Sequence, residues 1–253
     1  MKIEVLGCSG GESPTRRLTC LLINDGLALD AGSLTQGIGL ERQAEIDAIV
    51  LTHSHLDHTN AIPFFIENVY GRKRAAIELY ASKATIYALR RNLFNDASWP
   101  DFTRLPNHLL PAIRFHELEN ELPVTLDGVR LTPIAVDHLV PTWGFLIEQG
   151  NSAVLWSSDT GPTERLWEIA NRTPNLKAVC IEVSFDNSMQ QIADVSMHLT
   201  PRTLGVELGK LERDVPILLH HLKPQCAERI EREVGQWGRA DIAFLEQGRV
   251  YEF

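Results

Sequence analysis

The sequence predicts an α/β domain in which two mixed sheets lie between outer layers of helices. Three observations lead to this prediction. Predicted strands come in two blocks, one in each half of the chain, and helical segments follow each block. No Pro-, Gly- or Ser-rich linker separates the halves, so we expect a single domain over residues 1–253. The chain is 44% hydrophobic, which suffices for the large core that two packed sheets need.

Strands joined by tight turns are predicted for the first half. Asn24-Asp25-Gly26 is a strong hairpin signal. IDAIVLT, residues 46–52, is an apolar run typical of a strand buried on both faces. A helix beginning near Asn60 would place Pro63 in its first turn, where backbone N–H groups have no intrahelical partner. The expected strands are residues 2–7, 18–25, 26–32 and 46–52.

The sequence pattern of residues 82–116 differs from that of the segments on either side. Helical spacing over 82–94 gives way to a stretch that contains three prolines. We predict a helical and Pro-rich lid insertion around 82–116 in the single domain.

The second half repeats the strand-and-turn pattern of the first. Asp127-Gly128 and Gly150-Asn151 predict two hairpins, and residues 241–253 predict a final one. Thr163 is the expected cap of a helix over 163–172. Further strands are expected at 177–184 and 215–221, and further helices at 201–213 and 227–237.

The segment LTHSHLDHTN, residues 51–60, concentrates side chains that bind metals. His53 and His55 lie two apart at the end of a predicted strand, so their rings point to the same side. Asp57 and His58 follow where the chain must turn. Imidazole and carboxylate together suit Zn²⁺, with Mn²⁺ or Fe²⁺ as alternatives. One ion cannot easily take four ligands from so short a loop, so we predict two divalent metal ions.

Three further side chains are placed at predicted strand ends in the same way. His138, Asp159 and His221 each close an apolar run. A lone histidine at a strand end is usually structural, but three in register with the first cluster favour a shared metal site. His220 is the rival of His221 for the last position.

HSHLDH matches the HxHxDH signature of the metallo-β-lactamase superfamily, and the spacing to the three later residues is similar too. The resemblance covers essentially the whole chain and implies an αβ/βα four-layer sandwich with a two-metal site. By this resemblance His53, His55 and His138 hold the first metal, Asp57, His58 and His221 hold the second, and Asp159 bridges them. His221 is preferred to His220 because the family's ligand directly precedes a loop like LKP.

The same resemblance suggests roles for residues beyond the metal ligands. His198 in MHLTP is the expected general acid, and Asp57 is the second residue expected to act in catalysis. Asp137 and Glu182 are candidates for orienting ligand imidazoles, although plain strand-end acids are an equal interpretation.

Several segments together look like class II 3′,5′-cyclic-nucleotide phosphodiesterases: VLGCSGGESPTRRLTCLLIN, THSHLDHTNAIPF, EVSF, MHLTP and HLKP. We therefore expect hydrolysis of cyclic AMP or cyclic GMP to the nucleoside 5′-monophosphate. The pieces also resemble the transfer-RNA 3′-processing endonucleases (the tRNase Z type), which is the first alternative. A metal-binding ligand sensor without turnover is the second.

Charge and composition limit the classes of substrate and partner that the protein is expected to have. The formal charge is −9 and no basic stripe is evident, so a small cyclic-nucleotide substrate is favoured over nucleic acid. No apolar run reaches the roughly eighteen residues of a membrane span. The N-terminus reads as a strand rather than a signal peptide, and four cysteines form no CxxC pair, so we expect a cytoplasmic protein. The family resemblance implies a homodimer.

Overall fold

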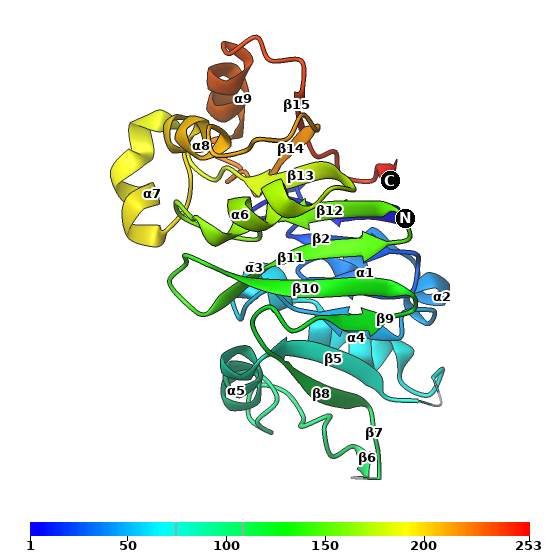
Figure 1. Ribbon diagram of the computed structural model, residues 1–253. Helices are drawn as coiled ribbons and strands as arrows, with labels where there is room; N and C mark the ends of the chain where they lie inside the picture. Colours follow the sequence, from blue (N-terminus) through cyan, green and yellow to red (C-terminus); the bar gives the residue numbers. More distant parts are fainter. Residues whose placement is uncertain (74, 108) are drawn as a thin grey trace.

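Two seven-stranded sheets pack face to face at the centre of the computed structural model, and helices cover their outer faces (Figure 1). The structure describes residues 1–73, 75–107 and 109–253; Arg74, and His108 of the expected lid, lie outside the described residues. The predicted fold class, two mixed sheets between helical layers, is confirmed.

The first sheet is built mainly from the N-terminal half, in the spatial order β16-β1-β2-β3-β4-β5-β8. Its strands are β1 (Lys2–Gly7), β2 (Cys20–Ile23), β3 (Leu27–Leu29), β4 (Ala48–Val50), β5 (Ile77–Ser82), β8 (Ile113–Leu118) and β16 (Val250–Glu252). The helices on its outer side are α1 (Leu34–Gly37), α2 (Leu40–Gln43), α3 (Leu56–Thr59), α4 (Ile62–Val69) and α5 (Lys83–Asn92).

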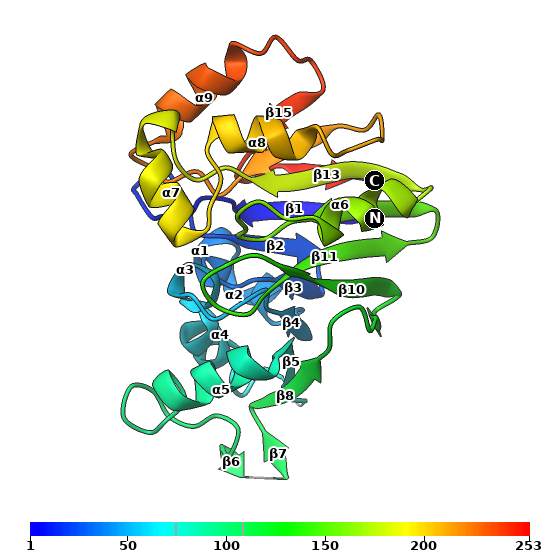
Figure 2. The same cartoon turned by 60° about the vertical axis from the view of Figure 1, so that its left-hand side comes forward.

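The second sheet has the order β15-β14-β13-β12-β11-β10-β9. Its strands are β9 (Val124–Leu126), β10 (Val129–Val136), β11 (Thr142–Gln149), β12 (Ser152–Trp156), β13 (Leu176–Glu182), β14 (Ile217–His220) and β15 (Ile242–Phe244). Figure 2 shows the helices of this half outside the sheet: α6 (Arg165–Arg172), α7 (Gln190–Ser196), α8 (Pro201–Leu208) and α9 (Ala227–Gly235). A short 3₁₀ helix, η1 (Asn187–Met189), precedes α7.

Three apolar clusters hold these layers together. The central cluster lies between the sheets, and Val5 and Leu21 of one sheet meet Phe145 and Trp156 of the other there, all fully buried or nearly so. The other two clusters fill the spaces between each sheet and its own helices. Residues on both faces of the strands are therefore buried, which explains why the strands read as continuous apolar runs.

The tight turns follow from the residues that the sequence provides. Asn24 and Asp25 both have positive φ, at 48° and 63°, in the three-residue turn 24–26 between the paired residues Ile23 and Leu27. Asp127 and Gly128 also have positive φ, at 47° and 74°. Pro63 lies in the first turn of α4, as predicted.

The final hairpin predicted over residues 241–253 is wrong. β15 pairs in parallel with β14 in the second sheet, whereas β16 pairs antiparallel with β1 in the first. Each of these two strands extends a different sheet, and the chain crosses between the sheets through a turn in which Gly248 N–H donates to the Val5 carbonyl. The C-terminal strands therefore link the two halves.

Two smaller predictions also need correction. Glu164, not Thr163, is the N-cap residue of α6, because the Glu164 carbonyl accepts the first intrahelical hydrogen bond, from the Glu168 N–H at 3.1 Å. The Thr163 N–H is bound instead to the buried Glu207 carboxylate 3.0 Å away. Residues 113–116 of the expected lid belong to β8, which pairs in parallel with β5. The helical part is present as α5, and two short strands, β6 (Pro106–Asn107) and β7 (Leu110–Pro111), follow it. A lid function stays a prediction.

The topology brings several strand ends to one edge of the molecule. β10, β12, β13 and β14 run in the same direction, as the pairing between them shows, so their C-terminal ends lie together. The C-terminal end of β4 faces them, since the Trp143 N–H donates to the Thr52 carbonyl at 3.0 Å. Within the described ranges, no helix has both the length and the apolarity needed to cross a bilayer.

Candidate metal centre

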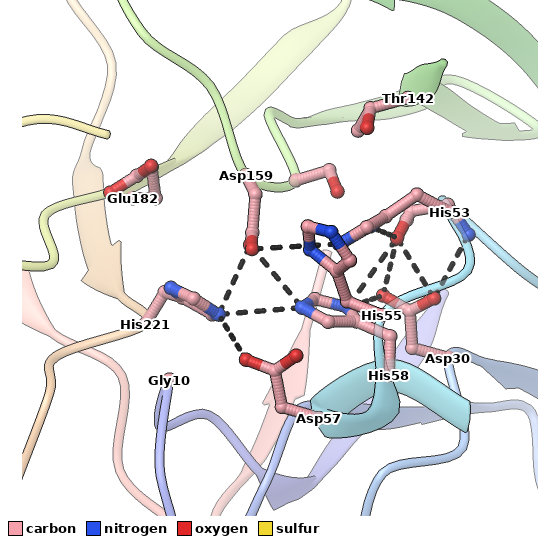
Figure 3. A network of polar contacts seen from close by, with 12 residues as sticks. Gly10, Asp30, His53, His55, Asp57, His58, Thr142, Asp159, Glu182 and His221 are labelled. Atoms are coloured by element: carbon pink, nitrogen blue, oxygen red, sulfur yellow. Dashed lines mark hydrogen bonds and ion pairs between the residues drawn. The ribbon is translucent and has the colours of Figure 1, made fainter. Parts of the chain in front are cut away.

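The seven side chains predicted as ligands lie at this edge of the sheets, and Figure 3 labels all of them except His138. The loop after β4 and the first turn of α3 carry His53, His55, Asp57 and His58, and the chain after β10, β12 and β14 carries His138, Asp159 and His221. They form two groups in which the potential ligand atoms all lie within 4.8 Å of one another: His53, His55, His138 and Asp159, and Asp57, His58, Asp159 and His221.

Asp159 lies between the two groups. Its Oδ2 is 3.7 Å from His53 Nε2 and 3.9 Å from His138 Nε2. Its Oδ1 is 3.3 Å from His58 Nε2 and 3.1 Å from His221 Nε2. Each carboxylate oxygen thus faces one group, which is the arrangement that a ligand shared between two ions requires.

Buried acceptors orient the rings of the first loop. His58 Nδ1 lies 2.8 Å from the carboxylate of Asp30, which follows β3. Thr52 donates its hydroxyl to the same carboxylate and can therefore accept from His53 Nδ1, 2.9 Å away. In both imidazoles Nδ1 carries the hydrogen, so that Nε2 presents its lone pair to the centre of the site.

The later histidines are oriented in the same way. His138 Nδ1 donates to the Met197 carbonyl at 3.1 Å, and His221 Nδ1 lies 2.9 Å from the Ser184 hydroxyl. Ser184 in turn donates to Glu182 at 2.8 Å, which leaves its oxygen free to accept from His221. Four imidazoles therefore direct Nε2 toward Asp159.

This arrangement fits divalent cations. His58 Nε2 and His221 Nε2 are 3.3 Å apart, and two neutral rings with hydrogen on Nδ1 would bring lone pair against lone pair. His53 Nε2 is buried with no hydrogen-bond partner in the described part of the chain. Nitrogen and carboxylate donors arranged in this way can bind metal ions.

The carboxylates around His58 favour a positive charge on its ring. Burial alone would lower the pKa of His58, but the charges of Asp159 and Asp30 and their hydrogen bonds raise it well above the ordinary value. The pKa of Asp159, which burial would raise, is held well below its usual range by His221 and His58. Metal binding must therefore compete with a proton at this position.

Asp30→Asn is expected to weaken metal binding by about 10- to 100-fold, because His58 loses the charged acceptor that orients it. Asn tolerates the left-handed backbone of Asp30, whose φ is 58°. Asp25→Asn is the matched control: it has a φ of 63° in an exposed turn far from the ligands. Competition titration with a zinc chelator measures the effect, and equal affinities in both variants would contradict the role given to Asp30.

His198 lies beside the second group and is paired with Glu182. Its Nδ1 is 2.6 Å from Glu182 Oε1, and its ring stacks on His221 with centroids 5.4 Å apart. Burial alone would lower the pKa of His198, but the charge and hydrogen bond of Glu182 raise it above the ordinary value. An imidazole whose pKa is raised thus lies next to the two groups of potential ligands.

At two positions around the site the backbone lies so close to a neighbouring residue that only glycine fits. A Cβ on Gly10 would lie 2.6 Å from the His221 ring, and one on Gly32 would lie 2.0 Å from the Asp57 carbonyl. His221 itself has a φ of 67°, which is uncommon for a residue other than glycine. Backbone strain of this kind occurs where a structure must hold a functional side chain in place.

The remaining predicted site residues have different surroundings. The His220 ring stacks on Trp156 at 3.9 Å, away from both ligand groups, so the geometry favours His221. Glu182 orients His198 rather than a ligand imidazole directly. Asp137 is exposed, and its side chain makes no polar contact with the described residues.

Sequence reasoning missed three residues that support the site: Asp30, Thr52 and Ser184. Asp30 had a usable signal, because it ends the buried strand LALD as Asp159 ends AVLWSSD. Ser184 follows β13 at the same edge, but a serine there has no distinctive pattern. Its role depends on β13 and β14 lying side by side.

The family of the chain follows from comparison with known proteins. Residues 22–221 match the family described as "Beta-lactamase superfamily domain", and the chain belongs to this superfamily. It is a metal-dependent hydrolase.

Two relatives and one solved structure define the likeness further. A protein of Yersinia pestis named "Probable 3',5'-cyclic-nucleotide phosphodiesterase" is 29% identical, over 100% of this chain and 89% of the relative. A "Ribonuclease Z" of Metallosphaera sedula is 27% identical, over 61% of this chain and 51% of the relative. Unliganded yeast PDE1 shares the fold, with a TM-score of 0.80, 18% identity and coverage of 98% of both chains. The resemblance inferred from the motifs is confirmed.

Proposed function

We propose that this protein is a two-metal phosphodiesterase that opens 3′,5′-cyclic nucleotides to nucleoside 5′-monophosphates. The observation that carries the proposal is the pair of ligand groups sharing Asp159, with the Glu182-paired His198 beside them. The full-length relative named as a cyclic-nucleotide phosphodiesterase supports this substrate. The formal charge of −9 also favours a small anion over a long nucleic acid.

We propose His53, His55, His138 and Asp159 as the ligands of one metal and Asp57, His58, Asp159 and His221 as the ligands of the other. When bound, two divalent ions supply Lewis acidity, which lowers the pKa of water and neutralises phosphoryl oxygens. Zn²⁺ suits this donor set best, with Mn²⁺ or Fe²⁺ as alternatives.

The residues of the chain contribute orientation and proton transfer. Asp57 is the carboxylate of the cluster with solvent access, since 22% of its side chain is exposed, and it orients the attacking water. Glu182 holds the Nδ1–H of His198, so that Nε2 carries the proton that the leaving ester oxygen needs. The 3′ oxygen of the ribose then departs as a hydroxyl group rather than as an alkoxide.

The activity is expected to fall at alkaline pH, because His198 must be protonated. Its pKa lies above the ordinary value, so kcat should decline as the pH rises through this raised pKa. In Glu182→Gln the carboxylate charge is lost and burial lowers the pKa of His198, so the alkaline limb should move to lower pH. Glu78→Gln, which alters the His116–Glu78 pair on β5 and β8, is the control. An unmoved limb in Glu182→Gln would contradict the assignment.

A direct assay separates the proposed function from its alternatives. Zn²⁺- and Mn²⁺-loaded protein is given cyclic AMP, cyclic GMP and a short RNA with a 3′ trailer, with the metal content counted. We expect ring opening of a cyclic nucleotide. Cleavage of the RNA alone would assign the chain to the processing endonucleases, as the Ribonuclease Z likeness would then suggest. Two bound metals without turnover of any phosphodiester would indicate a ligand sensor.

We also propose that the protein acts in the cytoplasm as a homodimer. The proposal rests on the family likeness and on the four cysteines, all of them free and buried. Light scattering coupled to size-exclusion chromatography tests the dimer, and a mass near 28.4 kDa would contradict it.

A further inference from the structure

Lys223 lies at the edge of the metal centre, in the loop after β14 and two residues beyond His221. Its Nζ is 2.5 Å from the Gly10 carbonyl oxygen and 3.7 Å from Asp57 Oδ2. One fifth of the side chain is exposed. The ammonium group is therefore near the carboxylate that we assign to the attacking water, while part of its surface still faces solvent.

Backbone contacts fix the position of this lysine. The Lys223 N–H donates to the Ser184 carbonyl at 3.1 Å, so the residue is tied to the same serine that orients His221. The Gly10 N–H donates to the Leu222 carbonyl at 3.2 Å, which joins the two loops. The Lys223 side chain thus adds a third hydrogen bond between these segments instead of extending freely from the surface.

The Lys223 ammonium group lies in a site that is otherwise rich in negative charge. Asp30, Asp57, Asp159 and Glu182 bring four carboxylates into the site. In the part of the chain that the structure describes, Lys223 is the one Lys or Arg whose side-chain nitrogen lies within 4 Å of any of them. Two divalent cations would balance these four charges, so the ammonium charge remains available for the substrate. A phosphodiester is a monoanion, and lysine binds phosphate as a point charge.

We propose that Lys223 is a specificity-determining residue that binds a non-bridging phosphoryl oxygen of the substrate. An ammonium group has three N–H donors, of which the Gly10 carbonyl takes one. A donor directed to solvent beside Asp57 can meet a phosphoryl oxygen close to the attacking water. This inference rests on the proposed phosphodiesterase function and names the group that selects an anionic substrate.

Lys223→Met tests the inference, with Lys223→Arg as the conservative variant. The matched control is Lys73→Met, because Lys73 also contacts one carbonyl, that of Ala44, and one aspartate, Asp47, far from the ligands. Two quantities are measured: the KM for bis(4-nitrophenyl) phosphate, and the Kd of inorganic phosphate by calorimetry. Metal content and Tm are determined for every variant.

Lys223→Met is expected to raise both KM and the phosphate Kd by about tenfold or more, as loss of a charge-assisted hydrogen bond should do. The arginine variant should recover much of the affinity, and Lys73→Met should match wild type. Unchanged KM and Kd, or a rise accompanied by lost metal or a lower Tm, would overturn the inference. If wild type hydrolyses no phosphodiester but phosphate affinity still depends on Lys223, the proposed function fails while the anion-binding role stands.

Discussion

Asp159→Ala is expected to lower phosphodiesterase activity by about a thousandfold or more, which corresponds to about 4 kcal/mol of transition-state stabilisation. The reason is geometric. Asp159 faces His53 and His138 with one oxygen and His58 and His221 with the other, so its removal takes a ligand from both groups at once. Metal analysis should show a fall from two ions per chain to one or fewer.

The control for this variant is Asp137→Ala. Asp137 is an exposed aspartate next to His138, and its side chain makes no polar contact with the described residues, so its removal should leave activity and metal content near wild type. An Asp159→Ala protein that kept two metals and activity within tenfold of wild type would contradict the shared-ligand assignment.

His198→Ala is expected to lower kcat for cyclic AMP by about 10²- to 10⁴-fold, the usual contribution of a general acid. Both metals should remain, because His198 lies beside the ligand groups and is held by Glu182. His116→Ala is the matched control, since His116 forms a similar pair with Glu78 on the outer strands of the first sheet.

The leaving group provides the decisive comparison for His198. Bis(4-nitrophenyl) phosphate releases a nitrophenolate, which departs without protonation, whereas the ribose oxygen of a cyclic nucleotide needs a proton. The variant should therefore retain much more of its activity on the nitrophenyl ester. Equal losses on both substrates would show that His198 supports the site in some other way.

The sequence could bring the predicted ligands together because His53, His138 and Asp159 each follow the end of a buried strand; that they bind metal ions stays a prediction. A buried apolar run that closes on His53, His138 or Asp159 can be identified without knowledge of its neighbours. The C-terminal ends of β12, β13 and β14 meet at one edge of the sheet because these strands are parallel. A ligand-type residue after each buried run was therefore enough to indicate a shared site.

Other features depended on contacts between segments that are distant in the chain. β15 and β16 look like a hairpin in sequence, but the free edges of two different sheets take one strand each. β5 and β8 pair across an insertion whose prolines obscured the second strand. Ser184 and Lys223 gain their roles only when β13, β14 and the loop at Gly10 are side by side.

The most direct test of the two-metal phosphodiesterase is a titration of metal-free protein with Zn²⁺ while cyclic AMP hydrolysis is measured. Activity is expected to rise until two equivalents per chain have been added and then to level off, because both ligand groups must be filled. A plateau at one equivalent, or metal uptake without hydrolysis at any ratio, would contradict the account.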